Sequence, residues 1–116
     1  MKLIVAMIDP ERVEAVQAAL YDTGTTLLYA SEAGDLREHT TEMYRGLHYR
    51  VPKARIRLEA VVINEMRVHE TVDAIAAAAS EGGSSQCAMG NIMVLPLDEC
   101  IPVRAQEGGF AAVMAR

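Results

Sequence analysis

Two stretches of the chain carry residue types that suit a small anionic ligand. Lys and Arg residues gather modestly between Arg45 and Arg57, and Gly82-Gly83-Ser84-Ser85 lies in the glycine- and serine-rich stretch Glu81–Gly90. Guanidinium and ammonium groups bind carboxylates and phosphates through charge-assisted hydrogen bonds. Successive backbone N–H groups of a glycine-rich loop can also cradle a phosphate. These residue types predict an anion site, although many glycine–serine loops bind nothing.

Metal and thiol chemistry is less well supported. His39, His48 and His69 do not form a tight ligand spacing, and most of the seven methionines lie in expected strands and helices, where methionine fills the core. We therefore expect no metal site. Cys87 and Cys100 are too few for a disulfide scaffold and are expected to be reduced thiols, with a redox role for Cys87 as the alternative.

Length, charge and hydropathy limit the class of protein. The chain of 116 residues predicts one domain, 1–116, and a net charge of -5 argues against nucleic acid as the main partner. No apolar run approaches the roughly eighteen residues of a membrane span. The short apolar start ends at Asp9-Pro10-Glu11, where a helix begins, so it predicts a buried strand and not a signal peptide. We therefore expect a cytoplasmic protein that is not an integral membrane protein.

The elements that must position these residues follow from apolar periodicity and turn signals. Asp9 is the expected N-cap of the first helix, and Gly24 is expected to end it. The predicted strands are Lys2–Ile8, Thr25–Ala33, Ala54–Ile63 and Asn91–Leu95, with a short fifth over Glu99–Arg104 and a second helix over Arg67–Ala79. The order βαββαβ predicts an α+β, ferredoxin-like fold. Both helices then cover one sheet face, and the other apolar face predicts oligomerisation.

A connection of about twenty residues, 34–53, separates the second and third predicted strands. It is rich in charge, and three tyrosines, Tyr29, Tyr44 and Tyr49, lie in it or beside it. Such a long structureless connection is usually functional or disordered. We expect a long effector loop with hinges at Gly34 and Gly46 that becomes ordered when ligand binds, and a flexible tail over 105–116.

The sequence resembles the PII signal-transduction family. The opening MKLIVAMIDPERVEAVQAAL, the segment TTEMYRGLHY at Thr40–Tyr49 and GNIMVLP at Gly90–Pro96 are similar to the family's first strand and helix, its loop signature and its fourth strand. The resemblance implies a non-enzymatic homotrimer that binds adenine nucleotides in clefts between subunits. It also implies that the long loop contacts a protein target, such as a transporter or an enzyme.

The resemblance also implies which residues bind the nucleotide, and where the phosphate contacts change. Arg55 takes the place of a family lysine, whereas Asn91 and Pro102 stand where the family has cations. Two phosphate contacts are therefore missing, which favours ADP or AMP over ATP. The implied nucleotide-binding residues are Met7, Tyr29, Arg55, Val61, Gly82, Gly83, Ser84, Gly90, Asn91, Ile92, Met93 and Arg104.

The loop has its own implied roles. Glu38 replaces a glutamine that helps to hold magnesium, ATP and 2-oxoglutarate in the family, and a carboxylate there would repel a second dianion. The cationic foot of the loop instead suits bicarbonate, as in a degenerate PII branch associated with carboxysome and bicarbonate-transport operons. Tyr49 aligns with a tyrosine that some members carry as a uridylylation site. The implied anion and effector residues are Arg37, Glu38, Arg45, Tyr49 and Lys53.

Two alternatives to this sensor stay open. One is a nitrogen regulator of the usual PII type that binds ATP and 2-oxoglutarate. The other is a small ferredoxin-like phosphate hydrolase, which would need an arginine phosphate cradle near the first strand and helix. The turn there, Met7-Ile8-Asp9-Pro10, is acidic, so the sequence favours the sensor and predicts no enzymatic activity and no cofactor.

Overall fold

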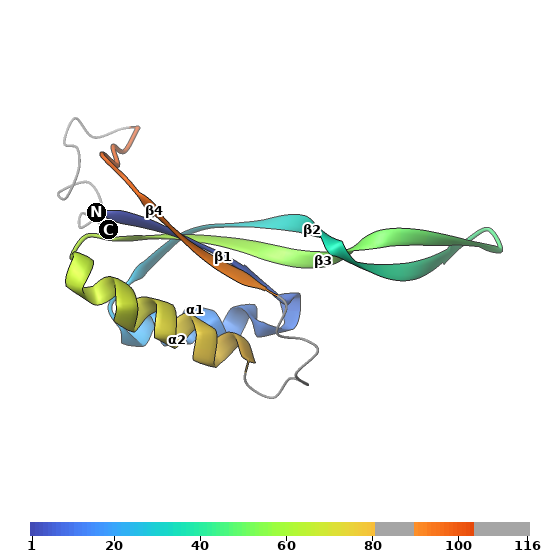
Figure 1. Cartoon of the computed structure of the whole chain (residues 1–116), viewed down its shortest axis with the longest axis horizontal. Coiled ribbons are helices and arrows are strands. Elements are labelled where there is room, and N and C mark those ends of the chain that lie inside the picture. The colour runs from blue at the N-terminus through green and yellow to red at the C-terminus, as the bar shows by residue number, and fades with distance from the viewer. Residues whose placement is uncertain (81–89, 104–116) are drawn as a thin grey trace.

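A computed structural model of the chain describes residues 1–80 and 90–103. Two helices lie on one face of a four-stranded antiparallel sheet, and two of the strands continue far beyond the helices as an arm (Figure 1). The elements are β1 (Lys2–Ile8), η1 (Pro10–Arg12), α1 (Val13–Asp22), β2 (Thr26–Tyr44), β3 (Leu47–Val62), η2 (Glu65–Arg67), α2 (Val68–Ser80) and β4 (Asn91–Pro96).

The order of the strands in the sheet is β2-β3-β1-β4. With the two helices in between, this is the predicted α+β, ferredoxin-like arrangement, and that prediction is confirmed. The fifth strand predicted over Glu99–Arg104 is wrong for the residues that are described, since 97–103 form no strand. Pro102 lacks the N–H that a ladder needs, so this stretch has no regular pairing. Arg104 lies outside the described residues.

The prediction of a structureless loop over 34–53 is also wrong. β2 and β3 pair from Thr26–Val61 out to the tip with two interruptions, and the arm closes with Tyr44 opposite Leu47. The two residues between them, Arg45 and Gly46, both have positive φ, 51° and 78°. That is the backbone of a tight two-residue hairpin turn, so Gly46 is a turn residue and not a hinge. Between Asp35 and His39 the register shifts, because residues 36–38 of β2 have no partner in β3.

The core lies between the sheet and the two helices. β1, β3, α1 and α2 contribute its buried residues, which are Ile4, Ala6, Ile8, Val16, Leu20, Leu58, Val62, Ile75 and Ala78. Two arginines also link the helices, each by a hydrogen bond to a carbonyl at the C-terminal end of the other helix. Arg12, at the start of the first helical segment, donates to the Ala78 carbonyl near the end of α2, and Arg67 of η2 donates to the Thr23 carbonyl after α1. Each cation therefore meets the negative end of the other helix, where carbonyls lack intrahelical partners.

The sequence predicts the end of the first helical segment correctly, but it predicts a capping role for Asp9 that the structure does not show. Gly24 has φ +75° just after α1, so it ends the helix in the left-handed conformation as expected. Asp9 occupies the N-cap position of η1, but its side chain makes no capping hydrogen bond. The carboxylate instead contacts Arg55 and Lys53 of β3. An ion pair with a buried cation has therefore replaced the cap.

The sheet face opposite the helices presents apolar side chains. Directly paired residues share a face, which places Tyr29, Glu59, Val5 and Met93 in one row across the sheet. Tyr29 and Met93 are 68% and 45% exposed. Both described helices lie on the other side (Figure 1). Within residues 1–80 and 90–103, no helix is long and apolar enough to cross a membrane.

The turn of the arm yields a first prediction. Nothing lies within 4 Å of the position that a Cβ would take on Gly46, so Gly46→Ala changes only the backbone preference at positive φ. The left-handed conformation costs about 1 kcal/mol in a residue with a Cβ. We expect backbone amides at the tip of the arm to exchange about fivefold faster, while exchange in β1 stays unchanged. Hydrogen exchange detected by mass spectrometry measures this. His48→Ala is the matched control, and equal exchange in both variants would contradict the assigned turn.

Candidate ligand site at the foot of the hairpin

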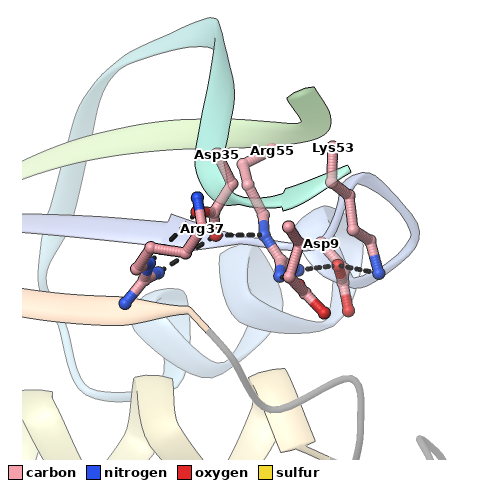
Figure 2. A network of polar contacts seen from close by, with 6 residues as sticks. Asp9, Asp35, Arg37, Lys53 and Arg55 are labelled. Carbon is pink, nitrogen blue, oxygen red and sulfur yellow. Dashed lines mark hydrogen bonds and ion pairs between the residues drawn. The ribbon is translucent and has the colours of Figure 1, made fainter. Parts of the chain in front are cut away.

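Six charged side chains gather where β1 ends and the β2–β3 arm leaves the sheet. Asp9 follows β1, Asp35 precedes the unpaired residues of β2, and Lys53 and Arg55 come from β3. Figure 2 shows these residues with Arg37, pointing toward one another from three strands. The remaining member is Glu38, which contacts Arg55. We call this set the foot cluster: Asp9, Asp35, Arg37, Glu38, Lys53 and Arg55.

Arg55 is the centre of the foot cluster. Its side chain is 1% exposed, and its guanidinium contacts three carboxylates. Nε donates to Asp35 Oδ2 at 3.3 Å, one terminal nitrogen donates to Asp9, and the other donates to Glu38. A buried guanidinium is tolerated only where charged partners replace its water, and these carboxylates do so from the residue after β1, from the paired part of β2 and from its unpaired residues. Arg55 thereby ties three separate segments to one point.

Asp35 is held by Arg37 as well as by Arg55. The Arg37 backbone N–H and Nε both donate to Asp35 Oδ1, at 2.9 and 3.0 Å, and Nη2 donates to Oδ2 at 3.0 Å. The Arg37 side chain, then its backbone N–H, hold the pKa of Asp35 well below its usual range. The same side-chain hydrogen bond raises the pKa of Arg37. Asp35 is therefore an anion at any ordinary pH.

The foot cluster has no surplus positive charge. Lys53 Nζ lies 3.8 Å from Asp9 Oδ1, so every cation of the cluster faces a carboxylate. Three acids and three bases give a formal charge of zero. The structure brings Arg37, Lys53 and Arg55 together, as the sequence predicts. The prediction of surplus positive charge at this place is wrong, because three carboxylates neutralise the cations. These carboxylates are Asp9, Asp35 and Glu38.

Three cavities adjoin the foot cluster. One, of about 480 Å³, is lined by Pro10, Glu32, Ala33, Gly34, Pro52, Ala54, Arg55 and Ile56. The other two share residues with each other, and the larger of these, of about 460 Å³, is lined by Met7, Gly34, Asp35, Leu36, Arg37, Arg55, Asn91 and Met93. The smaller, of about 310 Å³, lies toward the end of α2 and is lined by Met7, Ile8, Asp9, Ala76, Ala79, Ser80, Gly90, Asn91 and Ile92. Met7 and Asn91 line both, so the two cavities meet where β1 and β4 pair.

The residues implied for nucleotide binding fall into three groups. Met7, Arg55, Asn91 and Met93 line the larger cavity, and Gly90 and Ile92 line the smaller one with Met7 and Asn91. Tyr29 and Val61 line neither and lie on the open face of the sheet. Gly82, Gly83, Ser84 and Arg104 lie outside the described residues, as does Cys87.

Gly90 has a geometric reason to be glycine. A Cβ at this position would lie 2.0 Å from the Met7 backbone oxygen, which is too close for any residue that has a side chain. Gly90 therefore lets the chain enter β4 directly against the end of β1, where both cavities meet. No group of three or more His, Cys, Asp or Glu side chains within residues 1–80 and 90–103 is placed to hold a metal ion.

The remaining implied effector residues lie at the far end of the arm. Arg45 lies over the Tyr44 ring at 5.2 Å from its centroid, and the Tyr44 and Tyr49 rings are 6.4 Å apart. The pairs Tyr44–Leu47 and Glu42–Tyr49 share one face. Tyr44, Leu47 and Tyr49 are 59%, 60% and 45% exposed, so this face presents an apolar patch to solvent. Arg45 and Tyr49 therefore lie away from the foot cluster, at the tip.

Sequence reasoning missed two members of the foot cluster, Asp9 and Asp35. Asp9 was assigned to helix capping, and Asp35 was assigned no role. A signal was present in the sequence, since Asp9 directly follows one predicted strand and Asp35 comes two residues after another, and both strands neighbour the strand of Arg55. Such positions converge at the end of a sheet, where a buried cation needs partners.

Comparisons with known proteins agree with this fold. A family model described as nitrogen regulatory protein P-II matches residues 1–107. The nitrogen regulatory protein P-II of Azospirillum brasilense is 34% identical over 119 residues, covering 97% of this chain and 100% of that protein. The protein of the same name from Rhodospirillum rubrum is 35% identical with the same coverage. Nitrogen regulatory protein P-II 2 of Methanothermobacter thermautotrophicus is 36% identical over 118 residues, covering 97% of both chains.

The fold and the foot cluster define a ferredoxin-like domain with a protruding arm and charged side chains where the arm begins. The chain belongs to the nitrogen regulatory protein P-II family, since the match covers most of its length. The resemblance inferred from the three sequence segments is confirmed. Membership makes the chain a regulatory, signal-transducing protein of the PII class.

Asp35 yields a prediction about acid stability. Its pKa is lower in the folded chain than the ordinary value of 3.8, so its ionised form stabilises the fold above about that pH. This contribution is lost as the pH falls below it, because the unfolded chain then binds the proton more readily. We expect Asp35→Asn to be less stable near neutral pH and to show a flatter loss of unfolding free energy below about pH 4.

Urea unfolding at fixed protein concentration, from about pH 7 down to about pH 2, measures this dependence. Asp98→Asn is the matched control, because Asp98 is exposed and has no ion pair within the described residues. The control should keep the acid dependence of the native chain. A profile of Asp35→Asn that runs parallel to that of the native chain would contradict the assignment.

Proposed function

We propose that this chain is a cytoplasmic, non-enzymatic PII sensor that binds an adenine nucleotide at the foot of the hairpin. The arm reports the bound state to a protein partner. One observation supports this most directly: Met7, Arg55, Asn91 and Met93, all implied for nucleotide binding, line one cavity together with Arg37. Its volume of about 460 Å³ lies within the range of small-molecule sites.

The charge of the site supports ADP or AMP as the preferred nucleotide. Arg37 and Arg55 are already engaged by carboxylates, and Asn91 adds no charge to the cavity. Each charge-assisted hydrogen bond to a phosphate contributes roughly 1.5–3 kcal/mol. A third phosphate would meet few cations and three nearby carboxylates. A ligand with fewer phosphates therefore fits this electrostatic environment better.

Bicarbonate is the second ligand of the proposal. It carries one negative charge on a flat group with two oxygens on one side, as a carboxylate does, and can take paired hydrogen bonds from a single guanidinium. In a foot cluster of zero formal charge, it can replace one carboxylate without adding a net charge. A polyphosphate cannot do so.

The arm supports a protein partner. Its tip presents Tyr44, Leu47 and Tyr49 on one face, and exposed aromatic and aliphatic side chains of this kind form the centres of protein interfaces. We propose a transporter or a component of carbon fixation, such as a carboxysome protein, as the target. The tip bears the contact residues and the foot cluster bears the ligand, so signal and readout lie at opposite ends of one hairpin.

The exposed apolar side chains on the open sheet face predict an oligomer, and membership of the PII family implies a homotrimer. Light scattering at micromolar concentration should give about three times 12.6 kDa, because Tyr29, Met93 and Leu95 are otherwise left in water. Met93→Glu should weaken assembly by placing a charge in the interface. Met66→Glu, at an exposed site on η2, is the control. A monomeric native chain would contradict the proposal.

A prediction about nucleotide preference tests the ligand. Native protein should bind ADP or AMP at least as tightly as ATP, and Asn91→Lys should shift the preference toward ATP by about tenfold, because it restores one phosphate contact at the cavity. Titration calorimetry with the three nucleotides measures this. Gln17→Lys, which adds the same charge at an exposed position on α1, should leave the preference unchanged.

Two outcomes would overturn the ligand proposal. If the native chain binds ATP far more tightly than ADP, the count of cations does not set the preference. If ATP and 2-oxoglutarate together bind most tightly, the chain is a nitrogen regulator of the usual PII type.

A further inference from the structure

Each helix receives a cation at its C-terminal end from the other helical segment. The last turns of α1 and α2 contain no basic residue of their own. Carbonyls in the last turn of a helix lack intrahelical partners and carry a partial negative charge. Arg12 Nε and Nη2 donate to the Ala78 carbonyl at 3.1 and 2.8 Å, and Arg67 donates to the Thr23 carbonyl. We call these contacts the Arg12 link and the Arg67 link. They have the same chemistry but lie at opposite ends of the helical layer.

The Arg12 link fixes the part of α2 that forms one wall of the smaller cavity. Ala76, Ala79 and Ser80 line this cavity of about 310 Å³, on either side of the carbonyl that Arg12 binds. The Ser80 hydroxyl lies within hydrogen-bond distance of the Ala76 and Ala77 carbonyls, at 2.9 and 3.2 Å. The end of α2 is therefore held by its own serine and by an arginine from another element.

The opposite wall of the smaller cavity belongs to the same short segment as Arg12. Met7, Ile8 and Asp9 line it, and η1, which contains Arg12, begins directly after Asp9. This segment thus forms one wall of the cavity and holds the other wall through the Arg12 link. The Arg67 link differs in this respect, because neither Arg67 nor Thr23 lines any of the three cavities.

We propose that Arg12 is a positioning residue for ligand binding. Its bond to the Ala78 carbonyl sets the width of the smaller cavity, and with it the affinity for a ligand that enters there. Arg12 does not line the cavity, so it acts through the last turn of α2. Two nitrogens of one planar guanidinium converge on one oxygen, which fixes the direction of the helix end as well as its distance. The identity of the ligand rests on the proposed function, but the effect of Arg12 on the cavity does not.

The first test compares the two links. Arg12→Met keeps an apolar stem but removes both donors, and should weaken ADP binding about tenfold because the end of α2 is no longer held. Arg67→Met is the matched control. It loses the same kind of bond at the other end of the layer and should bind ADP as the native chain does. Titration calorimetry measures the affinities, at a temperature where urea unfolding shows that all variants are folded.

A conservative variant separates positioning from general destabilisation. Arg12→Lys keeps a donor that can reach the Ala78 carbonyl and should recover most of the lost affinity. If Arg12→Met binds ADP as tightly as the native chain, the Arg12 link has no role in binding. If Arg12→Met and Arg67→Met weaken binding equally, the effect belongs to the helical layer as a whole. Either result would overturn the proposal.

A second test asks whether the ligand enters the smaller cavity. Ala79→Leu adds apolar volume to the cavity wall and should weaken ADP binding, whereas Ala77→Leu, on the exposed side of α2, should not. Unchanged ADP binding by Ala79→Leu would show that the ligand lies elsewhere, and the proposal would then be wrong.

A third test needs no nucleotide and separates this proposal from the proposed function. If the native chain binds none of AMP, ADP and ATP, the nucleotide proposal fails. Xenon then probes the cavity, because xenon binds to apolar cavities. The methyl NMR signals of Ile8 and Ile92, which line the cavity, should shift under xenon in the native chain and in Arg67→Met, and should shift less in Arg12→Met. Equal shifts in all three chains, or none in any of them, would overturn the role of Arg12.

Discussion

A buried guanidinium at the end of a sheet is the constraint on which this structure depends. Arg55 has almost no contact with solvent, so its charge must be compensated inside the protein. Asp9 and Asp35 reach it from β1 and β2, and Glu38 reaches it from the unpaired bulge. If one of these carboxylates left without a substitute, a buried charge would lose part of its compensation, which is costly. The foot cluster, the start of the helical layer and the root of the arm are therefore connected through Arg55.

The sequence predicted the layered part of the fold because that part depends on burial. The continuous apolar run of β1 and the apolar stripes of both helices match their core contacts, and Gly24 marks the end of α1. The arm was missed for the opposite reason. Over residues 39–52 the two strands pair only with each other, and most of their side chains face water, so no apolar stripe marks them. The signal that was available is the turn residue Gly46, between segments containing β-branched and aromatic residues.

The sequence predicted the three cations of the foot cluster and Glu38, but it missed Asp9 and Asp35. Arg55 and Asp9 are 46 residues apart in sequence, and Arg55 and Asp35 are 20 apart. No local sequence pattern indicates contacts at that separation. The position of Asp9 before Pro10 and Glu11 is a local pattern, and it indicates helix capping. The physical requirement that a buried arginine needs carboxylates would have corrected this, but the burial of Arg55 is itself a property of the fold. An alternating strand gives no reason to place a charged residue inside.

The same arrangement explains how the arm is held to the sheet. A two-stranded hairpin without a second layer is marginally stable by itself, so the arm depends on its attachment to the sheet. That attachment is made by hydrogen-bonded pairs up to Asp35–Lys53 and then by the foot cluster across the bulge. Contacts at the bulge are charged and partly open to solvent, whereas those of the sheet core are apolar and buried. The arm is therefore joined to an apolar, buried platform through charged contacts at the bulge.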